Sequence, residues 1–139
     1  MADGTLRLEI VTPHRRLISA EADEVTAPGF HGEFGVLPGH TPYLVQLGVG
    51  ILSYRSGSAR YFLSIIGGYA EVGPDRVTIL TEVAERAEDI NTQRARAALH
   101  RAEERMMGRS QDSIDFERAE LALKRAVTRL GVARQSGMA

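Results

Sequence analysis

Arginines repeat at helical spacing in the last third of the chain, where their side chains could bind an anion. Arg94 and Arg101 lie seven residues apart in "NTQRARAALHR", and Arg125 and Arg129 lie four apart in "KRAVTR". Each pair shares one helix face, and antiparallel helices would bring the pairs together. Their guanidinium forks would suit phosphate oxygens. A merely solvated face is an equally good interpretation, because a general coding bias already explains why these residues are Arg, as are 16 of the 17 basic residues, although it does not explain their spacing.

Patterns that would indicate catalysis are missing. The chain has no cysteine, which excludes disulfides, thiolate metal sites and a cysteine nucleophile. Its four histidines lack metal-ligand spacing, and "GVGILS" fails the dinucleotide-binding pattern at its third glycine. We therefore expect a protein that is not an enzyme, while a stand-alone enzyme remains an alternative that nucleotide hydrolysis by the isolated chain would support.

The overall charge favours neither nucleic acid nor an anionic membrane. Seventeen basic and 18 acidic side chains give a formal net charge of -1. A nucleic-acid-binding module could use the arginine face, but residues 87–139 carry a net charge of only +2 and the chain has no tryptophan. No apolar run approaches the ~18 residues that span a bilayer. We expect a cytoplasmic protein that reaches a membrane only through a partner.

Composition divides the chain near residue 85. All five prolines and 11 of the 14 glycines lie in residues 1–84. Short strand-like runs recur there, and in "TLRLEI" the residues Leu6, Leu8 and Ile10 alternate onto one face. The other runs are "EVTA", "GILSYR", "RYFLSII", "YAEV" and "RVTIL", with hairpin turns at "RSGSAR" and "VGPDRV". The pattern predicts an antiparallel β-sandwich or flattened barrel over residues 1–86, with no regular element in "GEFGVLPGHTPYL".

Residues 87–139 are predicted to form an antiparallel helical hairpin. On each helix, apolar residues recur every three or four positions and form a seam along one face. The second helix is predicted to start near Asp112 or Ser113. The seam residues are Ala95, Ala98, Leu99, Ala102 and Met106 on the first helix, and Phe116, Ala119, Leu123, Ala126 and Leu130 on the second. Alanine buries little apolar surface. The seam therefore indicates either close packing or a hairpin that can detach.

Five ordered segments resemble the ε subunit of the bacterial F-type ATP synthase over nearly the entire chain. They are "VTPHR", "GEFGVLPGHTPYL", "SIIGGYAEV", "VTILTEVAERAEDI" and "SIDFERAELALKRAVTRL". The resemblance implies a central-stalk subunit of a proton-translocating synthase, at the cytoplasmic face of the cell membrane and bound there peripherally through the complex. Its β-sandwich would contact the γ subunit and the c-ring, with Glu33 and His40 facing the ring.

The same resemblance implies a movable hairpin. In this family the hairpin folds against the sandwich or extends along γ into the catalytic head of α and β subunits, where its second helix restrains ATP hydrolysis. Arg118, Lys124, Arg125 and Arg129 are then the residues expected to meet acidic surface on the β subunits.

A subgroup of the family, from bacilli, binds ATP as a regulatory ligand in the folded hairpin through an Ile/Leu-Asp-x-x-Arg-Ala motif. This chain has "INTQRA", which matches at Ile90, Arg94 and Ala95 and places Asn91 at the aspartate. The subgroup's other nucleotide-contacting positions are occupied here by Glu85, Arg101, Arg125 and Arg129.

The asparagine leaves two interpretations of that motif. Asn can still pair with an adenine edge, so we expect ATP binding with altered affinity, in which Glu85, Ile90 and Asn91 surround the base. The alternatives are the same rotor subunit with its ATP site lost, because Asn91 caps a helix as well as Asp does, or a stand-alone nucleotide- or anion-binding module.

Overall fold

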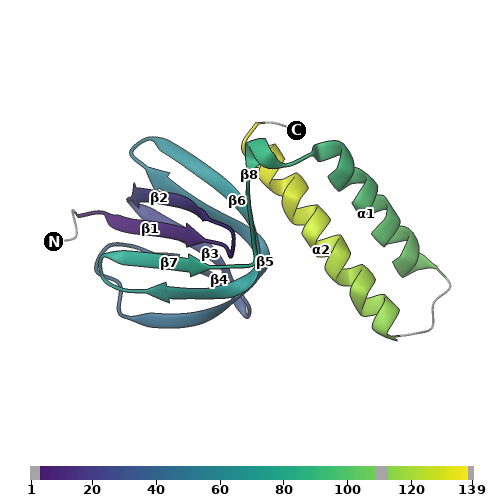
Figure 1. The fold of residues 1–139 in the computed structure, drawn as a ribbon, viewed down its shortest axis with the longest axis horizontal. Helices are drawn as coiled ribbons and strands as arrows, with labels where there is room; N and C mark the ends of the chain where they lie inside the picture. Colours follow the sequence, from purple (N-terminus) through teal and green to yellow (C-terminus); the bar gives the residue numbers. More distant parts are fainter. Residues whose placement is uncertain (1–3, 109–112, 138–139) are drawn as a thin grey trace.

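The computed structural model describes residues 4–108 and 113–137, which form a β-sandwich and a two-helix hairpin beside it (Figure 1). The predicted fold class is confirmed. The strands are β1 (Leu6–Val11), β2 (Arg16–Ala22), β3 (Glu24–Gly29), β4 (Gly32–Val36), β5 (Tyr43–Ser56), β6 (Ala59–Val72), β7 (Arg76–Leu80) and β8 (Val83–Arg86). A 3-10 turn, η1 (Ala87–Asp89), leads into the helices α1 (Thr92–Met107) and α2 (Ser113–Gln135).

All eight strands belong to one folded sheet, in the order β2-β1-β7-β6-β5-β3-β4, with β8 also pairing with β6. The long β5–β6 hairpin runs through its middle, in register from Tyr43 opposite Val72 to Ser56 opposite Ala59. One pair departs from the predicted antiparallel arrangement, because β1 and β7 are parallel. Each is antiparallel to its other neighbour, β2 or β6, so the parallel pair is the place where the two hairpins meet.

Alternating side chains supply the core of the sandwich. Leu6, Leu8 and Ile10 are fully buried, as the sequence predicts. Other fully buried aliphatic side chains come from both halves of the sheet: Val25, Leu52, Leu63, Ile65, Val77 and Ile79. At roughly 25 cal/mol per Å² of apolar surface, this burial is the main stabilisation of the N-terminal part.

Several predicted strand boundaries are wrong. The segment "GEFGVLPGHTPYL" contains β4, which pairs with β3, and the start of β5, which pairs with β6. The runs "RYFLSII" and "YAEV" are one strand, β6, which continues through Gly67 and Gly68 at φ of 74° and 110°. A Cβ on Gly68 would lie 2.0 Å from the Leu80 carbonyl oxygen, so the close approach of β7 requires glycine there. Strands β2 and β8 were not predicted.

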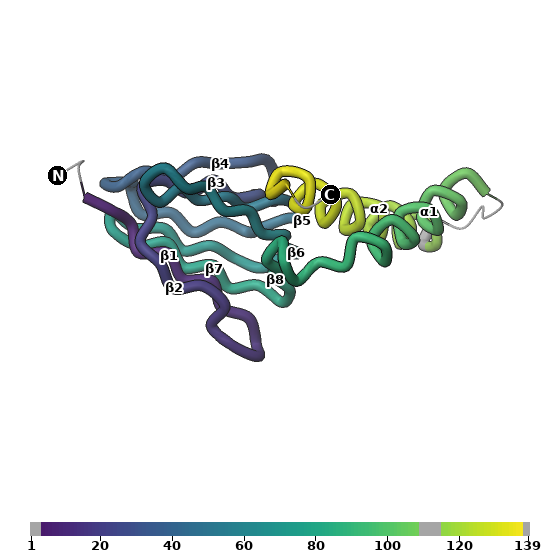
Figure 2. Tube along the Cα trace, turned by 90° about the horizontal axis from the view of Figure 1, so that it is seen from above, coloured from purple at the N-terminus to yellow at the C-terminus, as the bar shows by residue number. Residues whose placement is uncertain are grey.

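The hairpin docks on the sandwich through one end of α2. That helix packs against β5, β6 and η1, whereas α1 packs mainly against α2. Val132 and Ala133 are fully buried at this junction. Figure 2 shows the rest of the hairpin running away from the sandwich. Docking therefore depends on a short contact.

The alanine seam lies where the sequence predicts, except at one end. Ala95, Ala102, Ala119 and Ala126 are buried between the helices. Phe116, predicted as a seam residue, is 44% exposed. It occupies the first turns of α2 near the tip of the hairpin, far from the sheet that covers the other end of the helix (Figure 1).

Candidate functional site

A hollow of about 270 Å³ opens where the hairpin meets the sandwich. We call it the Asn91 hollow. Strand β8, the η1–α1 turn and both helices contribute to it, and its lining is Glu85, Asp89, Ile90, Asn91, Arg94, Ala95, Ala98, Arg101 and Arg129. Six of the seven residues predicted to bind nucleotide thus lie around one space.

A second hollow, of about 250 Å³, lies between the two helices, and we call it the Arg105 hollow. Its lining is Ala98, Arg101, Ala102, Arg105, Ala122, Arg125 and Arg129. Arg125, the seventh predicted residue, is found here. The two hollows share Ala98, Arg101 and Arg129, so they adjoin one another.

Glu85 connects the sheet with the hairpin. Its Oε1 accepts a hydrogen bond from Ser64 Oγ of β6 at 2.8 Å and another from Arg129 Nε of α2 at 2.7 Å. Both members of the ion pair are about three-quarters buried at the side chain. Ser64 is itself fully buried, so the carboxylate is held on the sheet and positions Arg129.

Asn91 is the N-cap of α1. Its Oδ1 accepts a hydrogen bond from the Arg94 backbone N–H at 3.0 Å. The carboxamide nitrogen makes no hydrogen bond with any residue the structure describes. Since a carbonyl oxygen has two lone pairs, Asn91 retains both an acceptor and a donor for a ligand while it caps the helix.

Positive charge dominates both hollows. Within residues 4–108 and 113–137, the guanidinium groups of Arg94, Arg101, Arg105 and Arg125 form no ion pair. Among the residues that the structure describes, two carboxylates, Glu85 and Asp89, line the Asn91 hollow, and none lines the Arg105 hollow. The first turn of α1 adds the positive end of the helix dipole. This combination can hold an anion.

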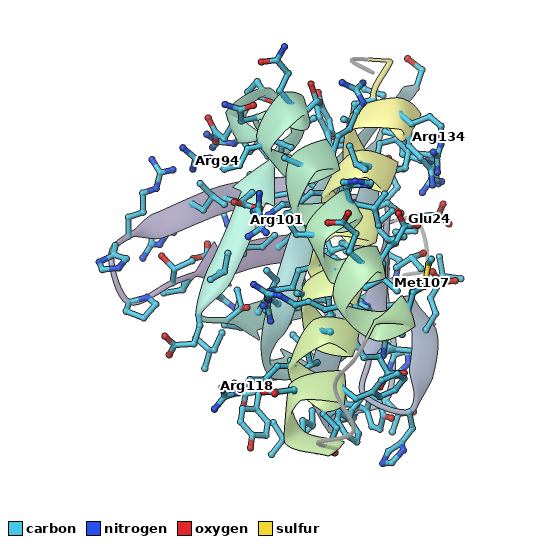
Figure 3. The ribbon with its side chains drawn as sticks, turned by 90° about the vertical axis from the view of Figure 1, so that its right-hand side faces the viewer. Glu24, Arg94, Arg101, Met107, Arg118 and Arg134 are labelled. Carbon is cyan, nitrogen blue, oxygen red and sulfur yellow. The ribbon has the colours of Figure 1, made fainter. Side chains whose placement is uncertain are left out.

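Figure 3 places Arg94, Arg101 and Arg118 on one side of the hairpin and Met107 and Arg134 on the other. The predicted contact residues of α2, Arg118 and Lys124, are exposed and line neither hollow.

The two residues predicted to face a ring of c subunits lie elsewhere, on the sandwich. Glu33 is exposed on β4. His40 lies in the β4–β5 loop, with Nδ1 2.6 Å from the Thr41 carbonyl oxygen and its ring beside Tyr43.

Two charged lining residues, Arg105 and Asp89, were missed from the sequence. Arg105 lies four residues after Arg101 and eleven after Arg94, so helical spacing alone could have found it. Asp89 lies in the 3-10 turn, outside any periodic pattern.

Two family models match the chain in succession. The ATP synthase delta/epsilon chain β-sandwich domain matches residues 5–87, and the long α-helix domain of the same chain matches residues 88–134. The chain belongs to the ATP synthase delta/epsilon family. As a member, it is a non-catalytic subunit of the central stalk of an F-type ATP synthase.

Relatives match the chain over nearly its full length. The ATP synthase epsilon chain of Syntrophobacter fumaroxidans is 51% identical over 131 residues, covering 94% of this chain and 97% of the relative. That of Geobacter metallireducens is 46% identical and covers 94% and 95%. The resemblance to the bacterial ε subunit is therefore confirmed.

Solved structures share the fold. A chain of the Euglena gracilis mitochondrial ATP synthase, solved in an assembly of OSCP, F1 and the c-ring, superposes with a TM-score of 0.82 at 26% identity, covering 96% of this chain and 83% of that one. A chain from the central stalk and c-ring of the Tetrahymena thermophila enzyme gives a TM-score of 0.62 at 12% identity, over 96% and 99% of the two chains, which shows the fold alone. In the described part of the chain, neither helix is both long enough and apolar enough to span a membrane.

Proposed function

We propose that the folded hairpin of this rotor subunit is a regulatory ATP site. The observation that carries the proposal is the composition of the Asn91 hollow, which takes Glu85 from the sandwich, Ile90 to Arg101 from the η1–α1 region, and Arg129 from α2. Such a site exists only while the hairpin is docked. A ligand bound there stabilises the docked state by its difference in affinity between states.

Within this site, the base and the phosphates have different partners. Glu85, Ile90 and Asn91 surround the adenine, because they supply one aliphatic side chain and the acceptors and donor that an adenine edge requires. Arg94, Arg101, Arg125 and Arg129 face the phosphates. When ATP is plentiful the hairpin stays docked, and the inhibition of ATP hydrolysis by the extended hairpin is relieved.

The short junction supports a hairpin that detaches. Only the last turns of α2 are buried on the sandwich, and the seam beyond them is mostly alanine. In the extended state Arg118 and Lys124, together with Arg125 and Arg129, meet acidic surface on the β subunits of the catalytic head.

The sandwich joins the rotor at the cytoplasmic face of the cell membrane. Its partners are the γ subunit and the c-ring, consistent with the assembly in which the Euglena relative was solved. Exposed Glu33 and the neighbouring loop with His40 contact the ring. Membrane association occurs through this complex.

Isothermal titration of the purified chain with ATP tests the nucleotide site, with GTP as the control ligand. We expect saturable ATP binding that Arg94→Ala weakens. Arg96→Ala is the matched control, because Arg96 is exposed on the same helix and lines neither hollow. No ATP binding at cellular concentrations would mean that Asn91 serves only as a helix cap, and binding of GTP as tight as ATP would exclude a base-specific site.

The inhibitory role of the hairpin must be tested in the assembled synthase. Complexes that contain a chain ending after Asp89 are expected to hydrolyse ATP faster than complexes with the full chain. Equal rates at low ATP would show that the hairpin does not restrain hydrolysis.

A further inference from the structure

The folded sheet leaves a gap where β2 approaches β6. Strand β2 stands at one end of the strand order, and β6 pairs with β8 from Leu63 to Ile66, so the residues of β6 before Leu63 pair with β5 alone in the described sheet. A cleft of about 550 Å³ opens here, and we call it the Tyr54 cleft. Strands β2, β5, β6 and β8 contribute to its lining, together with η1 and Ser136 directly after α2. No described residue of this lining belongs to either hollow.

Tyr54 is the buried polar residue of the cleft. It is 6% exposed, and its hydroxyl makes no hydrogen bond to any residue that the structure describes. In that part of the chain every fully inaccessible side-chain oxygen or nitrogen has a partner, so the Tyr54 hydroxyl must be accessible, and the cleft gives the access. Buried polar groups in folded proteins normally have a partner. The hydroxyl therefore points to a ligand that supplies one.

The same hydroxyl stays protonated at neutral pH, so it can donate to an anion. Burial raises the pKa of the Tyr54 phenol above its usual value, and Tyr61 adds to the rise in pKa. Arg86 opposes this change in pKa, and Glu88 adds the smallest increase. All three groups line the cleft, which places the hydroxyl among them. Glu88 is exposed, so water screens its repulsion of an anion.

Arg86 brings an available positive charge to the cleft. Its Nη2 donates to the Leu17 carbonyl oxygen of β2 at 2.7 Å, which holds the guanidinium in place. A guanidinium has five N–H donors, and Arg86 forms no ion pair in the described part of the chain, so it retains donors for a ligand. The other arginine of the described lining, Arg60, is already paired with Glu24.

The cleft also offers aromatic and aliphatic surface. Tyr61 stacks on Tyr54 across the strands, with ring centroids 4.9 Å apart and planes inclined by 26°. Because Tyr61 is 47% exposed, part of its ring remains open to a second aromatic group. Aliphatic side chains line the same space, namely those of Ile18, Ala20 and Leu63. The volume lies within the usual range of small-molecule sites.

We propose that the Tyr54 cleft binds a small aromatic carboxylate. The carboxylate of the ligand accepts hydrogen bonds from the Tyr54 hydroxyl and the Arg86 guanidinium, and its ring packs against Tyr61 and the aliphatic wall. An inorganic anion would leave the apolar surface unused, and a neutral aromatic compound would leave Arg86 without a charged partner. This site is independent of the proposed ATP site, because the two lie in different parts of the fold.

Fluorescence anisotropy of 2-naphthoate tests the cleft in the full chain, which has no tryptophan to interfere. We expect saturable binding of 2-naphthoate and about tenfold weaker binding of the neutral 2-naphthamide, measured by its displacement of 2-naphthoate. Tyr54→Phe removes only the hydroxyl and should weaken 2-naphthoate about tenfold, from the loss of one hydrogen bond to a charged group. Arg86→Gln should weaken it at least as much. Absence of saturable 2-naphthoate binding would overturn the site.

Tyr69→Phe is the matched control for Tyr54→Phe. It removes a hydroxyl from an exposed tyrosine of the same strand outside the cleft, and we expect a change below about twofold. Circular dichroism and urea midpoints confirm that each variant folds. Equal affinities of Tyr54→Phe and Tyr69→Phe for 2-naphthoate would overturn the site, and so would equal binding of 2-naphthoate and 2-naphthamide, since the cleft would then recognise apolar surface alone.

Competition with ATP separates this inference from the proposed function. Excess ATP should not displace 2-naphthoate, because the two ligands occupy different parts of the fold. Displacement would place 2-naphthoate in the Asn91 hollow and overturn the cleft as its site. Binding of 2-naphthoate that depends on Tyr54 would uphold the cleft whether or not the chain binds ATP.

Discussion

Arg129 Nε on α2 lies 2.7 Å from Glu85 Oε1 on β8, and among the described residues this is the only ion pair between the hairpin and the sandwich. The same arginine lines both hollows. Docking of the hairpin and binding of an anion therefore involve one side chain, which allows a ligand and the hairpin position to influence each other.

Replacing Glu85 with glutamine should loosen the hairpin without unfolding the sandwich. The change removes the charge that faces the guanidinium of Arg129, which is about three-quarters buried, and we expect docking to weaken by about 1 kcal/mol. Hydrogen exchange should then be faster in α2 and unchanged in β6. Glu82→Gln, an exposed neighbour with no ion pair in the described residues, should leave both rates as they are. Equal exchange rates in the two variants would contradict a docking role for Glu85.

The alanine seam should resist larger side chains. The side chain of Ala126 on α2 is buried against α1, with only 1% of its surface exposed. Ala126→Leu should therefore force the helices apart, at an expected cost of about 1–3 kcal/mol. Ala97→Leu on the exposed face of α1 is the control. Helix content and hydrogen exchange of α1 measure the effect. An Ala126→Leu variant whose α1 exchanges no faster than the control would show that the seam tolerates extra volume.

A comparison of alanine substitutions at two glycines tests the packing of the sheet. Gly57 and Gly68 both have positive φ, but only at Gly68 would a Cβ collide with backbone, at the Leu80 carbonyl. Gly68→Ala should cost more than about 3 kcal/mol, whereas Gly57→Ala should cost only the ~1–2 kcal/mol of a left-handed alanine. Urea unfolding measures both. Similar midpoints would mean that β7 moves away from β6 at no great cost.

The sandwich should lose stability in acid through Glu9. Its pKa is lowered from 4.5, chiefly by the hydrogen bond from Ser19, with Arg16 and Arg7 adding to the effect against the opposing effect of burial. A lowered pKa means that stabilisation is present above 4.5 and is lost as the pH falls through the folded-state value. Glu9→Gln should therefore lose less stability than wild type between neutral pH and pH below 4.5, measured by urea midpoints. An equal loss of stability in the two proteins would show that protonation of Glu9 does not cause the acid sensitivity.

Local periodicity is the reason that much of this architecture could be predicted. The alternation of Leu6, Leu8 and Ile10 fixes the buried face of β1, and steps of seven and four residues fix the faces on which Arg101 and Arg125 lie. Both patterns act within one element, so the sequence displays them directly.

Pairing between distant segments could not be predicted in the same way. Strand β4 is extended because β3 binds it, although its own glycines favour no regular structure, and the parallel β1–β7 pair joins residues about seventy positions apart. The ion pair of Glu85 with Arg129 is likewise a product of docking. The seam and arginine spacing predicted the faces that meet, but the position at which α2 rests on the sheet comes only from the folded structure.

Two substitutions at Asn91 separate helix capping from ligand recognition. Asn91→Ala removes the acceptor for the Arg94 N–H and should destabilise the start of α1 by about 1 kcal/mol, while Asn91→Asp keeps the cap. Aspartate also adds a charge that favours the first turn of the helix but removes the amide donor. If Asn91 contacts the base, Asn91→Asp should change ATP affinity while α1 keeps wild-type hydrogen exchange. Identical ATP affinities in Asn91→Asp and wild type would mean that the side chain caps the helix and does no more.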